Sequence, residues 1–194
     1  MKYLKKIVKK ILIFVIVYYL KFFSCFLGIN FVTKFLSSSS LTFLFPYIIS
    51  KFGAKVGDNV VIKNIIIDNP KRNFENLKIG SNVYIGKNVF FDLPDEIILE
   101  DDVVIAANVQ FFTHGDVGNR LLSKYIKRQQ GKIIVGKGSW IGAGSIILYG
   151  SIIEPLCIIA AGSVVKGHLE SGWIYGGVPA KKIKKIWGEG EEDG

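Results

Sequence analysis

The chain has 194 residues, of which 49% are hydrophobic, enough for one domain with a core and an appendage. Its net charge of +9 belongs to one segment: residues 1–57 hold nine lysines and no acidic residue, whereas residues 58–194 hold 16 basic and 16 acidic residues. This neutral remainder argues against a nucleic-acid surface. The distant Cys25 and Cys157 argue against a disulfide framework or a metal cluster and favour a reducing compartment.

Residues 1–36 begin with a lysine-rich run and continue as an apolar stretch over 11–32. The stretch has nearly the length of a membrane-spanning helix, but Lys21 lies in its middle. On a helix, Lys21 lies three turns beyond Lys10 and returns to the basic side, beside a wide apolar face. We therefore expect residues 1–52 to be a helical segment that associates with a membrane surface. Packing on the following domain or a neighbouring subunit is one alternative, and a true span is another.

From Gly53 onward, apolar residues recur every six positions. A first short piece contains Val56 and Ile62. A first full series contains Ile79, Ile85, Phe91, Ile97, Val103 and Val109. A second contains Val135, Ile141, Ile147, Ile153, Ile159 and Val165. The polar, turn-rich segment 68–78 is expected to project as a loop.

In the second series a small residue follows each apolar position by four, with glycine usually just before it. These glycines are Gly138, Gly144, Gly150 and Gly162, and Leu156 is the exception. A period of six fits neither an α-helix nor a coiled coil. It suits a short strand and a tight corner, with the β-branched residue pointing inward and glycine accommodating the corner.

The two series are out of phase, because 26 positions separate Val109 from Val135. Residues 115–134 are therefore an inserted loop, and His114 stands at its root. The length of this loop indicates a functional or partner-contacting role. At the end of the chain, residues 180–187 are predicted to form a short amphipathic helix, followed by a disordered tail over 188–194.

Three motifs connect the repeats to a known family: Ser139-Trp140-Ile141-Gly142, Ala161-Gly162-Ser163-Val164-Val165 and Gly177-Val178-Pro179-Ala180-Lys181. With these motifs, the chain from about Gly53 to Ile186 resembles the hexapeptide-repeat acyltransferases. Within them it is similar to the maltose, galactoside and xenobiotic acetyltransferase group, and it resembles polysaccharide O-acetyltransferases. The resemblance implies a left-handed parallel β-helix over residues 53–187. It also implies a homotrimer with the active site between subunits and the loop 115–134 over the neighbour's cleft.

The resemblance places the catalytic base at His114, and an imidazole is suited to take a proton from a hydroxyl near neutral pH. A corner histidine with a structural hydrogen bond is the alternative. The acceptor-binding or histidine-orienting candidates are Asp92, with Asp95 nearby, and Asp116. Asn88 is a further candidate, because galactoside-type relatives carry an asparagine two positions earlier, at the place of Gly86. His168, after the repeats, is interpreted as a solvated turn residue.

For acetyl-coenzyme A, the resemblance assigns seven residues. Ala143 and Ala161 would bind the pantetheine arm, Lys166 and Gly167 the nucleotide end, and Lys181 and Lys184 the 3′-phosphate, with Trp140 beside the cofactor. A backbone amide near Gly142–Ala143 would stabilise the oxyanion. The structural alternatives are that Trp140 simply caps a face of the β-helix and that Lys181 to Lys185 form a solvated face of the C-terminal helix.

The resulting prediction is an acetyl-CoA-dependent O-acetyltransferase that acts on a hydroxyl of a sugar or a cell-surface polysaccharide precursor at the inner face of the cytoplasmic membrane. The alternatives are an amino-sugar N-acetyltransferase and a non-catalytic hexapeptide scaffold. A zinc site of three histidines is excluded by count, since the chain has two, and no metal or nucleic acid is expected.

Overall fold

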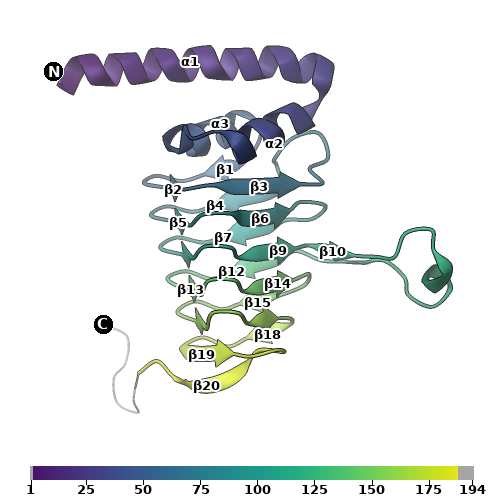
Figure 1. The fold of residues 1–194 in the computed structure, drawn as a ribbon. Helices are drawn as coiled ribbons and strands as arrows, with labels where there is room; N and C mark the ends of the chain where they lie inside the picture. Colours follow the sequence, from purple (N-terminus) through teal and green to yellow (C-terminus); the bar gives the residue numbers. More distant parts are fainter. Residues whose placement is uncertain (1, 188–194) are drawn as a thin grey trace.

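The computed structural model describes residues 2–187, and in these residues the fold is a β-solenoid with helices at its N-terminal end (Figure 1). Parallel strands stack into three sheets, which we call A, B and C, and the chain visits the sheets in turn. One circuit is a coil, and the described residues contain about six coils. The tail 188–194, for which the sequence predicted disorder, lies outside the described residues.

Sheet A contains β1 (Lys55–Val56), β4 (Leu77–Ile79), β7 (Ile97–Leu99), β12 (Ile133–Val135), β15 (Ile152–Ile153) and β18 (His168–Leu169). Sheet B contains β2 (Val61–Ile62), β5 (Tyr84–Ile85), β8 (Val104–Ile105), β13 (Trp140–Ile141), β16 (Ile158–Ile159), β19 (Trp173–Gly176) and β20 (Lys181–Lys185). Sheet C contains β3 (Ile65–Asp68), β6 (Val89–Asp92), β9 (Gln110–Phe112), β14 (Ile146–Leu148) and β17 (Val164–Val165).

The apolar positions of the second repeat series point into the solenoid, as predicted. All six of them are at most 1% exposed. Each pairs with its equivalent one coil away, as Val135 does with Ile153 and Ile141 with Ile159. Since burying a valine or isoleucine side chain contributes about 1.5–3 kcal/mol relative to exposure, these inward columns supply the core of the domain.

The first full series is less regular than its spacing predicted. Ile97, which continues the period of six after Phe91, pairs with Ile133, whereas Leu99 takes the place equivalent to Ile79. Two residues are therefore inserted in the corner before β7. Because Ile97 and Leu99 are both apolar and buried, the spacing of apolar residues in the sequence does not reveal this two-residue shift in register.

The corners between strands use a left-handed backbone. The four predicted glycines of the second series all have positive φ. In the earlier coils the same conformation is adopted by Asn59, Asn82, Asn88, Asp102 and Asn108. Asparagine and aspartate, with their short polar side chains, tolerate this region better than most residues. Their side chains also link adjacent coils, since the Asn59 amide donates to the Asn82 amide oxygen at 3.2 Å.

Leu156 breaks the glycine pattern but not the backbone conformation, because its φ is 58°. A bulky residue in this region costs roughly 1 kcal/mol or more. Leu156→Asn should therefore raise the free energy of unfolding by about 0.5–1 kcal/mol, measured by chemical denaturation. Asn82→Leu, at the same corner of an earlier coil, should lower it. A less stable Leu156→Asn protein would show that the packing of Leu156 against Gly138 outweighs the strain.

Helices cover the N-terminal end of the solenoid. α2 (Ile29–Ser38), η1 (Thr42–Leu44) and α3 (Phe45–Lys51) pack near the first coil. They bury Val32, Leu36, Leu44, Phe45, Ile48 and Ile49 almost completely. This cap shields the apolar interior that the first coil would otherwise leave open.

α1 (Lys2–Leu27) lies across this cap, on the side away from the solenoid and at a large angle to the stacking direction (Figure 1). Its stretch Lys10–Leu27 is long and apolar enough to cross a membrane by length and composition, and 11% of it is buried. A core helix or a signal sequence near the N-terminus can pass the same test.

A strand closes the C-terminal end, where the sequence predicted a helix over residues 180–187, and that prediction was wrong. β20 pairs antiparallel with β19, the last strand of sheet B. The Lys182 ammonium lies 4.5 Å from the centre of the Trp173 ring. The physical reason is tertiary: β19 offers an open edge, and a strand satisfies its backbone groups where a helix would not.

The insertion after His114 forms a hairpin. β10 (His114–Gly115) pairs antiparallel with β11 (Gln129–Gln130), and η2 (Leu121–Lys124) lies at the far end. Figure 1 shows the hairpin extending sideways, well beyond the body. Its side chains Leu121 and Tyr125 are 84% and 83% exposed. The predicted role of this segment, contact with a neighbouring subunit, stays a prediction.

Candidate active site

The irregularities of the solenoid gather at one corner, where the chain passes from sheet C to sheet A. Between β14 and β15 this passage takes three residues. In the first three coils it instead holds the polar segment 69–76, the enlarged turn 93–96 and the hairpin within 113–132. We call this the insertion corner. Insertions that map to one face of a repeat protein commonly mark its binding face.

His114 and Asp92 meet at the insertion corner. Nδ1 of His114 lies 2.7 Å from Oδ2 of Asp92, although 22 positions separate the residues. Stacking brings them together, because Asp92 ends β6 and pairs in register with Phe112 of β9 in the next coil. The Asp92 side chain is 2% exposed and the His114 side chain 22%, so the carboxylate is buried behind a partly accessible imidazole.

Donors hold both carboxylate oxygens of Asp92. The Asn69 amide donates to Oδ1 at 2.8 Å, and the backbone N–H of Thr113 donates to Oδ2 at 3.1 Å. The hydroxyl of Thr113, which is fully buried, donates to the Asp92 carbonyl oxygen at 2.9 Å. These bonds offset the cost of burying the carboxylate as an anion.

The carboxylate determines the tautomer of His114. An ionised aspartate only accepts hydrogen bonds, so Nδ1 must carry the hydrogen between them. In the neutral imidazole, Nε2 then holds the free lone pair. The pair therefore presents an oriented base rather than a histidine with both nitrogens engaged.

A hollow of about 430 Å³ opens beside His114. All three insertions line it, through Asn69, Pro70, Lys71, Pro94, His114, Arg128 and Gln130. Lys71 and Arg128 bring positive charge, and Arg128 also pairs with Asp116 at 3.3 Å. The wall of the hollow thus suits a ligand that carries a negative group.

Asp116 and Asp95 do not contact the imidazole in this structure. Asp116 accepts a hydrogen bond from the Gly118 N–H at 3.0 Å and pairs with Arg128. Asp95 accepts from the Gln130 amide at 3.3 Å. Both carboxylates therefore stabilise the hairpin, Asp116 within it and Asp95 at the point where it leaves the solenoid.

Asn88 lies at a different corner, between sheets B and C. It is exposed and donates to the Asn108 amide oxygen at 3.4 Å. Of the candidates for orienting His114, the single chain brings only Asp92 to it, and a role for Asn88 in acceptor binding stays a prediction.

The residues assigned to acetyl-coenzyme A do not line one cavity of this chain. Ala143 and Ala161 are exposed at the corner between sheets B and C on adjacent coils, where the Gly162 N–H donates to the Ala143 carbonyl at 2.9 Å. Trp140 points outward from sheet B and is 50% exposed. These positions are compatible with ligand contact, but their roles stay predictions.

The basic members of this set are spread further. Lys166 and Gly167 follow β17 at the insertion corner, two coils beyond His114, and the Lys166 ammonium lies 4.9 Å from the centre of the Tyr149 ring. Lys181 and Lys184 are exposed on β20. They lie on a strand, which corrects the predicted helical setting.

The Gly142 amide is already engaged, since its N–H donates to the Ile159 carbonyl at 2.8 Å within sheet B. It is therefore not available for the predicted oxyanion contact. Its corner is also separated from His114 by one side of the solenoid.

Gly142 instead matters for packing. A Cβ there would lie 2.6 Å from the Ala161 nitrogen and the Ile159 oxygen. Gly142→Ala should therefore lower the free energy of unfolding by about 3 kcal/mol, measured by urea denaturation. Gly144→Ala is the control, because its φ is 69° but nothing lies within 4 Å of its added Cβ; it should cost about 1 kcal/mol. Equal losses would contradict the packing argument.

His168 is exposed on β18, and its Nε2 lies 2.7 Å from Oε1 of Glu154. The N–H of Ser171 and then this imidazole lower the pKa of Glu154. The pair is a surface contact away from the insertion corner.

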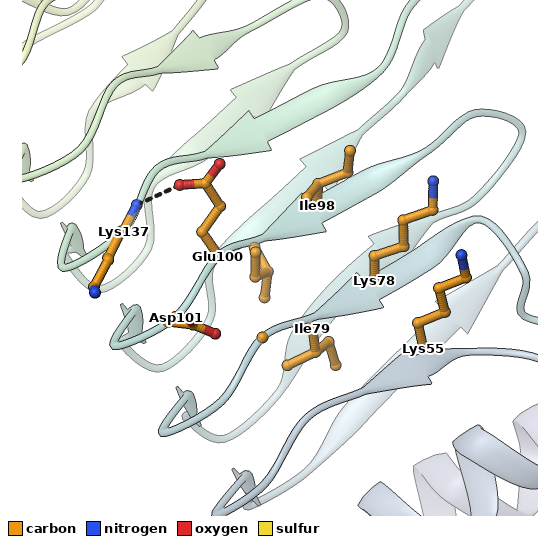
Figure 2. Close-up of a pocket in the computed structure, with 9 residues that line it drawn as sticks. Lys55, Lys78, Ile79, Ile98, Glu100, Asp101 and Lys137 are labelled. Atoms are coloured by element: carbon orange, nitrogen blue, oxygen red, sulfur yellow. Dashed lines mark hydrogen bonds between the residues drawn. The ribbon is translucent and has the colours of Figure 1, made fainter.

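A second hollow, of about 350 Å³, lies on the outer face of sheet A. Figure 2 shows Lys55 and Lys78 pointing outward from adjacent strands, with Glu100 and Asp101 at the neighbouring corner. Glu100 accepts the backbone N–H of Lys137 at 2.9 Å and so caps a turn. No imidazole or thiol is among the described residues that line this hollow, so we place the candidate active site at the insertion corner.

Seven residues of that corner were not singled out from the sequence: Asn69, Pro70, Lys71, Pro94, Thr113, Arg128 and Gln130. All except Pro94, which belongs to the turn 93–96, lie in the two long insertions, 69–76 and 113–132. The interruption of the hexads could have identified these segments as the binding face. Among residues 2–187, no group of three or more histidine, cysteine, aspartate or glutamate side chains could hold a metal ion.

Comparison with known proteins agrees with this solenoid. Residues 132–167 match the family "Bacterial transferase hexapeptide (six repeats)", and residues 76–110 match "Hexapeptide repeat of succinyl-transferase". Galactoside O-acetyltransferase of Escherichia coli is 30% identical over 113 residues, which cover 55% of this chain and 56% of that protein.

Two solved structures are similar over most of both chains. A mutant of AntD, an N-acyltransferase from Bacillus cereus in complex with dTDP and coenzyme A, has a TM-score of 0.60 at 27% identity and covers 71% of this chain and 75% of its own. A maltose O-acetyltransferase from Clostridium difficile has a TM-score of 0.65 at 25% identity, with 80% and 83% covered.

The repeats, the solenoid and these matches define a hexapeptide-repeat protein. Two stretches of the chain match hexapeptide-repeat transferase families, and the chain is similar to galactoside and maltose O-acetyltransferases. In sequence, it aligns with little more than half the length of the curated relatives that it matches.

Proposed function

We propose that this protein is an acetyl-CoA-dependent O-acetyltransferase that acts on a hydroxyl of a sugar or a cell-surface polysaccharide precursor. The observation that carries the proposal is the His114–Asp92 pair, which leaves Nε2 free beside a hollow. Similarity to a galactoside and a maltose O-acetyltransferase supports a sugar hydroxyl as the acceptor.

In this proposal His114 is the general base. A sugar hydroxyl is too weak an acid to ionise at neutral pH, so Nε2 takes its proton as the oxygen bonds to the acyl carbon. Asp92 stabilises the imidazolium that results, and His114 returns the proton to the departing sulfur. Acetyl-CoA supplies the activated acetyl group, and no covalent acetyl-enzyme is required, because both substrates meet in one cleft.

The site is proposed to be completed by neighbouring subunits of a homotrimer of left-handed solenoids. Trp140, Ala143, Ala161 and Lys166 lie on separate parts of one chain, which supports this. A binding site in which the cofactor contacts all four residues would need surfaces from a neighbouring subunit. Lys181 and Lys184 would then meet the 3′-phosphate as point charges. Light scattering on the purified protein would detect the trimer.

A second candidate is an amino-sugar N-acetyltransferase that uses a nucleotide-linked acceptor. The cations Lys71 and Arg128 in the hollow favour an acceptor with phosphate groups. AntD, an N-acyltransferase, was solved with dTDP.

The two candidates are separated by measuring coenzyme A release from acetyl-CoA with neutral sugars, amino sugars and nucleotide-linked sugars. An acetyl group that mild alkali removes from the product is an ester and supports O-transfer, whereas a stable one is an amide. Binding of acetyl-CoA without release in the presence of any acceptor would instead support a non-catalytic scaffold.

A further inference from the structure

α1 carries an apolar face that the rest of the described chain leaves uncovered. This outer face consists of Ile11, Phe14, Val15, Tyr18 and Phe22, which recur at helical spacing and are each more than half exposed. A contiguous apolar surface of this kind marks an interaction site.

The opposite side of α1 is fixed to the body. Leu20 is fully buried, and Tyr19 and Phe23 lie 6.0 Å and 5.6 Å from the Phe31 ring of α2, measured between ring centroids. A helix crossing a bilayer would have to leave these contacts. The packing therefore favours a helix that lies along the surface of its partner.

The charge of the segment identifies that partner. Lys10 and Lys21 are exposed, and their eleven-residue separation returns them to one flank of the outer face. Residues 1–57 contain nine lysines and no acidic residue, while the remainder of the chain is neutral. An apolar centre with a cationic flank complements a membrane surface of anionic lipids, which attracts each lysine near it.

We propose that the outer face of α1 docks into the surface layer of an anionic lipid bilayer, with the helix axis parallel to the membrane. Because α1 lies across the end of the solenoid, the coils then extend away from the bilayer (Figure 1). His114 and the hairpin belong to the third coil, roughly 28 Å from α1: about 9 Å from α1 to the cap helices, about as much again to the first coil, and two steps of about 4.8 Å between strands. Docking does not depend on the proposed function.

A dye on Cys25 tests the docking. Cys25 continues the outer face three residues after Phe22 and is exposed, whereas Cys157 is buried, so an environment-sensitive maleimide should label Cys25 alone. Burial also raises the pKa of the Cys157 thiol to about 11, which keeps it unreactive at neutral pH. Vesicles of phosphatidylcholine mixed with phosphatidylglycerol should shift the dye emission to the blue, and pure phosphatidylcholine should do so more weakly.

The control places the dye at the hairpin, as Tyr125→Cys in a Cys25→Ser background. Its emission should not change, because the hairpin is held well above the bilayer. A shift at the hairpin but not at Cys25 would mean that another face docks, and would overturn the proposal.

Charge and apolar variants separate the two contributions. Phe14→Asp and Phe22→Asp should each weaken vesicle binding by about ten-fold or more, from the lost aromatic burial. Lys21→Glu should weaken binding to the anionic vesicles by about five-fold or more and barely affect binding to pure phosphatidylcholine. Tyr125→Asp, the same kind of change at another exposed aromatic, should have no effect.

Three results would overturn the proposal. The first is vesicle binding that Phe14→Asp and Phe22→Asp leave unchanged. The second is absence of vesicle binding together with a Cys25–Cys25 disulfide on oxidation, which would make the outer face a contact between two copies. The third is resistance to alkaline extraction with dye quenching at the bilayer centre, which would make α1 a span. Turnover of a soluble acceptor should survive Phe14→Asp, so a failure of docking is distinguishable from a failure of the proposed function.

Discussion

Replacing His114 with alanine should lower turnover by about 10²–10⁴-fold, which is the usual effect of removing a positioned general base. The imidazole is the group at the insertion corner with a free lone pair beside the hollow, and its orientation is set by the 2.7 Å contact with Asp92. Folding should change little, because the side chain is partly exposed. The measurement is coenzyme A release with whichever acceptor the panel identifies, alongside acetyl-CoA binding by calorimetry.

His168→Ala is the matched control for this experiment. It removes the other histidine of the chain, which lies on the surface beside Glu154, and should leave turnover nearly unchanged. If the His114 variant keeps near-normal turnover, the base is misassigned. If it loses acetyl-CoA binding as well, His114 contributes to binding rather than to proton transfer.

The architecture could be predicted from the sequence because the period of six is a local property. In the second series, each inward residue faces an equivalent residue one coil away, so one β-branched column repeats without interruption. The shift before Leu99 was hidden because Ile97 also points inward. The final strand was missed because its stability depends on the open edge of β19, which lies outside the local sequence.

The site was only partly predictable for a related reason. Insertions carry no period, so Asn69 and Thr113 gave no signal that they surround Asp92. The sequence could not choose between Asp92 and Asp116 as the partner of His114. The two residues inserted before β7 shift the register so that Asp92 pairs with Phe112, close to His114. The hairpin pairing places Asp116 beside Arg128 instead.

Asp92→Asn should lower turnover by about 100-fold and destabilise the fold by about 1–3 kcal/mol. Both oxygens of Asp92 accept hydrogen bonds, Oδ1 from Asn69 and Oδ2 from Thr113 and His114. An amide has only one oxygen, so its NH₂ group must face a donor on one side. In one orientation the new NH₂ group faces the NH₂ group of Asn69, so two donors meet. In the other it faces His114, whose Nδ1 must then accept, and the ring hydrogen moves to Nε2, which loses its free lone pair.

The double variant Asp92→Asn, Asn69→Asp separates hydrogen bonding from charge. It reverses the donor and acceptor of the 2.8 Å contact, so the amide of the new residue at position 92 can donate to position 69 while its oxygen still accepts from His114. Stability should return to within about 1 kcal/mol of the parent. Turnover should recover only in part, because the negative charge no longer adjoins the imidazolium. Nitrogen NMR of a His168→Ala background reports the His114 tautomer directly, and it should show hydrogen on Nδ1 in the parent and the double variant. A single variant that keeps full turnover, or a parent with hydrogen on Nε2, would remove Asp92 from its role in orienting the base.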